Sequence, residues 1–212
     1  MRQPRSSRKA RRRRPAHGTK GSPVDLDRIA QGVRMILEGI GEDPEREGLR
    51  DTPCRVAKAY AELCRGVDQE QPVSIRTFCA AGQNELIIVK DISFSSLCEH
   101  HLLPYVGRCD VVYLPANDRI AGLSAIVETV ELMAARPTIQ ERLTTEIADR
   151  LMSEIQAKGV MVVMEAEHMC LAIRGVKKRD SRIVTSAMRG YLRKLETRTE
   201  ALALIGRSIS GK

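Results

Sequence analysis

Residues 86–114 read LIIVKDISFSSLCEHHLLPYVGRCDVVYL. The two ends of this stretch, residues 86–94 and 109–114, are rich in β-branched and aromatic residues, which are typical of strands. Between them lies SSLCEHHLLPYVG, which holds a cysteine and two adjacent histidines. The stretch therefore predicts two strands whose connection carries residue types that bind metals.

Helical patterns lie on both sides of this stretch. Ser22 to Asp25 forms a capping-box pattern with Pro23 at the first helical position, and apolar residues then recur at helical spacing up to Ile40. Thr52 as the cap and Pro53 as the first residue predict a second helix, and residues 124–135 a third. After Pro137, apolar residues step by four along one helical face: Ile139, Leu143, Ile147, Leu151 and Ile155.

Three further segments, 160–166, 169–174 and 183–187, have the composition of strands. Strands outnumber the long connections that parallel pairing would need, so we expect an α+β domain with a mainly antiparallel sheet. We expect this domain to span residues 22–212, with its N-terminal helices at about 22–66.

The positive charge of the chain is concentrated at its start. Residues 1–20 hold nine Lys or Arg and no acid, whereas the remainder has 26 bases against 27 acids. We therefore expect a disordered basic tail over residues 1–21. It could contact nucleic acid or acidic lipid, carry an address signal, or solubilise the chain. Binding to nucleic acid is disfavoured, because no aromatic side chain that could stack on nucleobases lies among the Lys and Arg residues of this tail.

Apolar runs long enough to span a membrane are missing from the sequence, and no secretory signal follows the arginines. We therefore expect a cytoplasmic protein with reduced thiols. Cysteines without a nearby histidine are expected to be small core residues: Cys54, Cys64, Cys79 and Cys109.

Three of the four histidines lie beside cysteines: His100 and His101 follow Cys98, and His168 precedes Cys170. Zinc favours thiolate and imidazole ligands. A spacing of three lets one tight turn present Cys98 and His101 to the same ion. It also leaves His100 free for proton transfer.

Cys170, expected on a strand next to His168, is the best candidate for a third ligand. No fourth ligand is evident, which favours an open, catalytic Zn²⁺ site over a closed structural one. The alternative is a set of buried thiols and core histidines without a metal.

Several motifs resemble the GTP cyclohydrolase I family, in the right order over roughly residues 24–206. These motifs are EGLRDTP (47–53), RVAK (55–58), SLCEHHLLPYVG (96–107), GLS (122–124), QERLT (140–144) and HMCLAIRG (168–175).

The resemblance implies a tunnelling fold, in which the sheets of neighbouring subunits join into a barrel. It also implies a toroidal homodecamer with active sites between subunits. The implied reaction is zinc-dependent hydrolysis of GTP at C8, with release of formate and formation of 7,8-dihydroneopterin triphosphate.

Site roles follow from the same resemblance. Cys98, His101 and Cys170 would bind zinc, and His100 would be the general acid/base at the purine nitrogen. His168 would lie near the ribose and phosphates. The remaining residues would bind substrate: Ser124 the ribose, Glu141 with Gln140 the guanine edge, and Arg174 a phosphate.

The chain departs from the family pattern after Ser124. Family members generally carry Lys directly after this serine and Arg three residues later, whereas this chain has Ala125 and Glu128. Two alternatives to a GTP hydrolase remain open, and this departure bears on the first of them. One is a paralogue that acts on a guanine nucleoside, monophosphate or modified guanine, and the other is a non-catalytic zinc scaffold.

Overall fold

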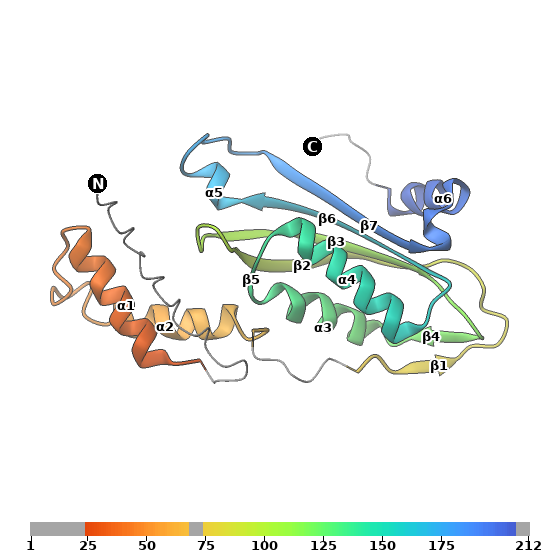
Figure 1. Cartoon of the computed structure of the whole chain (residues 1–212), viewed down its shortest axis with the longest axis horizontal. Helices are drawn as coiled ribbons and strands as arrows, with labels where there is room; N and C mark the ends of the chain where they lie inside the picture. Colours follow the sequence, from red (N-terminus) through yellow and green to blue (C-terminus); the bar gives the residue numbers. More distant parts are fainter. Residues whose placement is uncertain (1–23, 68–73, 207–212) are drawn as a thin grey trace, which may run out of the picture.

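The computed structural model describes residues 24–67 and 74–206, and its centre is a five-stranded sheet in the order β5-β2-β3-β6-β7 (Figure 1). Strands β2, β3, β6 and β7 pair antiparallel, and β5 runs parallel to β2. The α+β class with a mainly antiparallel sheet is thus confirmed. The strand bounds are β2 Ile87–Cys98, β3 Pro104–Leu114, β5 Pro137–Thr138, β6 Gly159–His168 and β7 Arg182–Gly190.

Helices α3 (Leu123–Ala134) and α4 (Gln140–Ile155) cover one face of this sheet (Figure 1). The residues expected on the inner face of α4 are buried, apart from a half-buried Ile139 that precedes the helix: Leu143, Ile147, Leu151 and Ile155. They pack on alternate residues of β3 and β6, such as Val111 and Val162. The main core lies between these two layers.

The opposite face of the sheet carries a smaller cluster. Here Val112 and Met161 pack against Leu192 of the 3₁₀ turn η1 (Tyr191–Arg193) and against α6 (Leu195–Ile205). Because both faces of β6 are covered at this end, its sequence GVMVVM is apolar without alternation.

The N-terminal helices α1 (Leu26–Gly39) and α2 (Thr52–Leu63) form a hairpin beside the sheet (Figure 1). The cap of α1 was predicted wrongly, because Asp25 is the N-cap and accepts a hydrogen bond from the N–H of Arg28 at 2.9 Å. Helix α1 thus begins later than expected, whereas α2 begins one residue earlier, at Thr52 with Asp51 as its cap. Ser22, Pro23 and the basic tail lie outside the described residues.

Two further differences concern short elements. Strands β1 (Thr77–Cys79) and β4 (Arg119–Ala121) form a separate antiparallel pair that the sequence did not indicate. The predicted strand at 169–174 is wrong, because Met169–Ala172 forms the one-turn helix α5 directly after β6. No helix within the described ranges is long and apolar enough to cross a membrane.

Candidate metal centre

The turn that follows β2 brings two ligand residues together. The N–H of Leu102 donates to the carbonyl of Cys98 at 2.8 Å, and the N–H of Cys98 donates to the carbonyl of Leu103 at 2.9 Å. Leu102 adopts a left-handed φ of 54°, which closes the turn. His101 thereby folds back over Cys98, with its Nδ1 3.7 Å from the sulfur.

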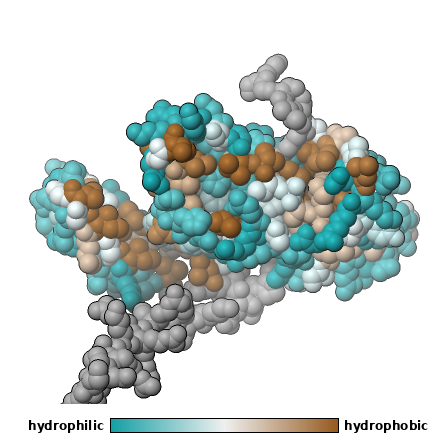
Figure 2. Space-filling model, turned by 45° about the horizontal axis from the view of Figure 1, so that its top comes forward, coloured by the Kyte–Doolittle hydropathy of each residue, from teal (hydrophilic) through white to brown (hydrophobic). Residues whose placement is uncertain are grey.

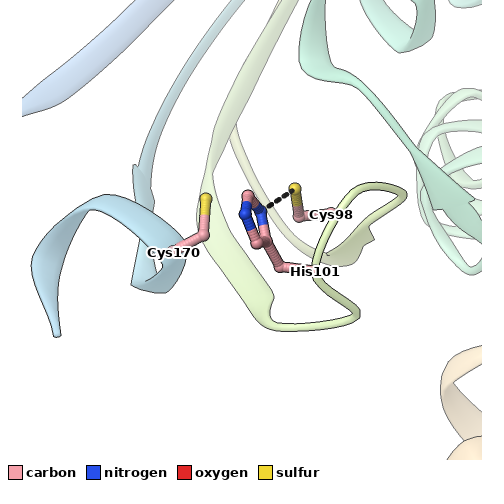
Figure 3. Close-up of side chains that lie close together, drawn as sticks. All are labelled: Cys98, His101 and Cys170. Atoms are coloured by element: carbon pink, nitrogen blue, oxygen red, sulfur yellow. Dashed lines mark hydrogen bonds between the residues drawn. The ribbon is translucent and has the colours of Figure 1, made fainter. Parts of the chain in front are cut away.

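Cys170 reaches the same place from α5. Because β6 pairs with β3 so that His168 lies opposite Tyr105, the helix after β6 begins beside the turn after β2. Ligand atoms of Cys98, His101 and Cys170 all lie within 4.8 Å of one another (Figure 3). The structure thus brings Cys170 to Cys98 and His101, as expected, although from a short helix in place of the expected strand.

This donor set fits a zinc ion. In a tetrahedral zinc site with sulfur and nitrogen ligands, neighbouring ligand atoms are about 3.6–3.8 Å apart, and the Cys98–His101 pair already has this separation. Cys98 is buried, Cys170 is half-buried and His101 is exposed. The centre is thus open to solvent on the side of His101, which leaves room for water or a substrate.

The polar surroundings of the centre include a cation. Nη1 of Arg174 lies 2.7 Å from Nε2 of His101, so the residue predicted to bind a phosphate is adjacent to the candidate metal ligands. Burial, reinforced by the neighbouring Cys98 thiol, raises the pKa of Cys170. A bound cation would oppose this shift, because metals bind the thiolate.

His100 lies at the rim of the centre. Its Nδ1 is 4.0 Å from the Cys98 sulfur, its ring meets that of His101 edge to face, and its side chain is 65% exposed. Glu99, 4.0 Å from Nε2 of His100, is itself held by both terminal nitrogens of Arg142. His100 is therefore an accessible imidazole beside the ligand cluster.

His168 forms the inner wall of the site. Its ring stacks on Tyr105 with a centroid distance of 4.5 Å and an angle of 5°, and its Nε2 lies 2.8 Å from Oε1 of Gln140. Burial lowers the pKa of His168, against an opposite effect of Glu141, and raises the pKa of Tyr105 to about 12. Tyr105 was missed by the sequence analysis, since only the β3–β6 register places it opposite His168.

Gln140 and Glu141, both predicted to hold guanine, differ in their surroundings. Glu141 is exposed in the first turn of α4. Gln140 is 1% exposed, and its side-chain nitrogen points inward to carbonyls of Met164 and Ile183. Only Glu141 therefore offers its side chain to solvent.

Ser124 is not brought to the metal centre. Ser124 is only three residues after Ala121, so the position of Ala121 fixes where Ser124 lies. The N–H of Ala121 donates to the hydroxyl of Tyr113 at 3.0 Å. Tyr113 is eight residues from Tyr105 along β3, which corresponds to about 27 Å of extended strand. Ser124 thus lies near the far end of the sheet from the centre, as the course of α3 in Figure 1 also shows.

Comparison with known proteins supplies a family. The family model described as GTP cyclohydrolase I matches residues 29–206. GTP cyclohydrolase 1 of Carboxydothermus hydrogenoformans is 50% identical over 184 residues, covering 86% of this chain and 96% of that protein. The enzyme of the same name from Brevibacillus brevis is 48% identical over 183 residues, covering 86% and 98%.

Among solved structures, the apo form of an archaeosine synthase QueF-Like aligns with 50% of this chain and 93% of that chain, at a TM-score of 0.42 and 14% identity.

Proposed function

The chain belongs to the GTP cyclohydrolase I family, and we propose that the centre of Cys98, His101 and Cys170 is where this hydrolase opens the guanine ring of GTP. The reaction hydrolyses the imidazole ring at C8, releases formate and yields 7,8-dihydroneopterin triphosphate. The observation that carries the assignment is the convergence of the three ligand atoms within 4.8 Å at an open site.

Zinc is the ion that we propose for this centre, because two thiols and an imidazole match its ligand preference. A zinc ion held by three protein ligands activates water for hydrolysis near neutral pH. Cys98 and Cys170 would bind it as thiolates and His101 as a neutral imidazole. The exposed side of the centre, next to His101, is where the guanine ring would enter.

His100 is the proposed general acid/base. It lies at the rim, 4.0 Å from the sulfur of Cys98, is accessible, and is of the residue type that most often serves as a general acid or base. A purine nitrogen bound at the centre would therefore lie within its reach. His168, on the inner wall, is the second proposed catalytic histidine.

Substrate recognition is proposed to use the residues around this centre. The exposed carboxylate of Glu141 can accept two parallel N–H bonds from the guanine edge. Arg174, beside His101, is placed to pair with a phosphate. Gln140 is proposed to support this wall of the site, since its amide is engaged within the protein.

A shared active site explains the position of Ser124. Because Ser124 lies far from the centre of its own chain, we propose that it reaches the ribose bound at the centre of a neighbouring subunit. The family arrangement, a homodecamer whose sheets join into a barrel, would supply this contact.

A second candidate substrate is a guanine nucleoside or monophosphate. The observation that favours it is the pair Ala125 and Glu128 near the start of α3, which places a carboxylate where the family generally carries cations. Glu128 is exposed, whereas Ala125 packs against the core. The change would weaken binding of a triphosphate and would leave the chemistry at the metal centre intact.

The decisive experiment incubates the zinc-loaded protein with GTP, GMP and guanosine and measures formate and absorbance. We expect the highest kcat/KM for GTP. The double variant Ala125→Lys, Glu128→Arg is the matched comparison, because it restores the family cations without touching the centre. A preference for GMP or guanosine that shifts towards GTP in this variant would establish the second candidate. If the protein releases formate from none of these three compounds, the proposal that it is a cyclohydrolase is refuted.

A further inference from the structure

A closed set of hydrogen bonds surrounds the side chain of Gln140 at the start of α4. The hydroxyl of Thr144 donates to the carbonyl of Gln140 at 2.7 Å. The hydroxyl of Thr185 on β7 lies 2.6 Å from that of Thr144 and 3.0 Å from Nε2 of Gln140. Since the Thr144 proton is used on the carbonyl, Thr185 donates to Thr144 and accepts from Gln140.

Two main-chain carbonyls, in addition to Thr185, also fix the orientation of the Gln140 side-chain amide. Its Nε2 lies 3.2 Å from the carbonyl of Met164 and 3.0 Å from that of Ile183, and carbonyls only accept. The amide nitrogen therefore faces the sheet. The amide oxygen faces His168, and it is the atom within 2.8 Å of Nε2 of that ring.

An oxygen that only accepts requires a donor opposite it. Nε2 of His168 consequently carries a hydrogen, and in the neutral ring the lone pair is left on Nδ1. Stacking on Tyr105 at 4.5 Å holds the plane of the same ring. The imidazole ring of His168 is thereby held in one orientation, with Nδ1 as the nitrogen that can accept a hydrogen bond.

We propose that Gln140 is a positioning residue that holds His168 as the Nε2–H tautomer, so that Nδ1 meets the substrate as a hydrogen-bond acceptor. This inference rests on the proposed function, and it sharpens the role of His168. An acceptor suits a hydroxyl of the ribose or a water molecule, whereas it does not suit a phosphate oxygen. Phosphate recognition is then left to cations such as Arg174.

The test begins with Gln140→Met, which keeps the length of the side chain and removes both polar atoms. We expect zinc content and assembly to be unchanged and kcat for GTP to fall by about 10–100-fold, with KM within about threefold. The matched control is Thr129→Val, which removes a buried hydroxyl that bonds to the carbonyl of Ala125 on α3, away from this wall. It should keep wild-type kcat.

Neutron diffraction from the zinc-loaded wild type gives a readout that does not depend on activity or on a variant's folding. We expect deuterium on Nε2 of His168 and none on Nδ1 in the neutral ring. Deuterium on Nδ1 alone, or wild-type kcat in Gln140→Met, would overturn the positioning role. Wild-type protein that releases no formate would instead refute the proposed function, while the neutron result would still decide the tautomer.

Discussion

Zinc binding at the proposed centre is expected to depend on the single sulfur atom of Cys170. Cys170 is the proposed ligand that comes from a separate segment, and without it Cys98 and His101 would offer zinc two protein ligands in place of three. We expect Cys170→Ala to lose both metal and activity, as measured by zinc analysis and formate release. Cys79 and Cys54 were wrongly expected in the core, since both are exposed. Cys79→Ala, which removes an exposed thiol on β1, is the control and should keep both. Full zinc occupancy in Cys170→Ala would show that the ligand assignment is wrong.

His100 and His101 are neighbours in sequence with different expected roles. His101 faces the Cys98 sulfur at 3.7 Å, whereas His100 lies at 4.0 Å and is largely exposed. His100→Ala should therefore retain zinc and lose about 10²–10⁴-fold in kcat, while His101→Ala should lose the metal. Zinc analysis and steady-state kinetics on both variants check this. Loss of zinc from His100→Ala would require the two roles to be exchanged.

At the scale of elements, the sequence predicted secondary structure correctly where the periodic pattern was long. The four-residue steps of α4 extend over four turns, and the burial of Leu143, Ile147 and Leu151 confirms the face that they indicated. Helix α5 is one turn long, so MCLA shows no periodicity and its apolar composition was wrongly interpreted as a strand. The approach of Cys170 to Cys98 and His101 was nevertheless predictable, because candidate zinc ligands are identified by residue type.

Close contact between β3 and β6 sets the geometry of the inner wall. A Cβ added at Gly107 would lie 2.0 Å from the carbonyl oxygen of Glu165 and 2.7 Å from Cα of Ala166, so the strands would have to separate. We expect Gly107→Ala to destabilise the fold by about 1–3 kcal/mol or more, measured by thermal unfolding. At Gly32 in α1 nothing lies within 4 Å, and Gly32→Ala should stabilise by up to about 1 kcal/mol. Equal effects of the two substitutions would contradict this account.

At the scale of the whole molecule, the described chain has features that a second copy would complete. Helix α1 and its C-cap expose apolar side chains, among them Met35, Ile36 and Ile40 at 64–70% exposure, and Figure 2 shows apolar residues on the N-terminal hairpin at the left. Ser124 is far from the centre of its own chain. The exposed apolar face of α1 was not predictable from its periodicity. The position of Ser124, by contrast, agrees with active sites between subunits, which the family resemblance implied.

A mixing experiment tests whether active sites are shared between chains. Cys170→Ala subunits should be inactive alone and Ser124→Ala subunits only weakly active. Coexpression should restore up to about a quarter of wild-type activity, because one site in four then combines two intact contributions. Sedimentation should show an oligomer at micromolar concentration. A monomer, or coexpressed subunits with no gain over the separate variants, would refute sharing.

Because α5 packs beside the turn after β2, the candidate ligands come together in a fixed order while the chain is synthesised and folds. Cys98 and His101 are translated long before Cys170, and they meet it only after β6 has paired with β3 across the two intervening helices. A nascent chain that ends before β6 carries two ligands and lacks the thiol that completes the set. Metal capture at the proposed centre would therefore be a late, non-local folding event that has to wait for the closure of distant strands.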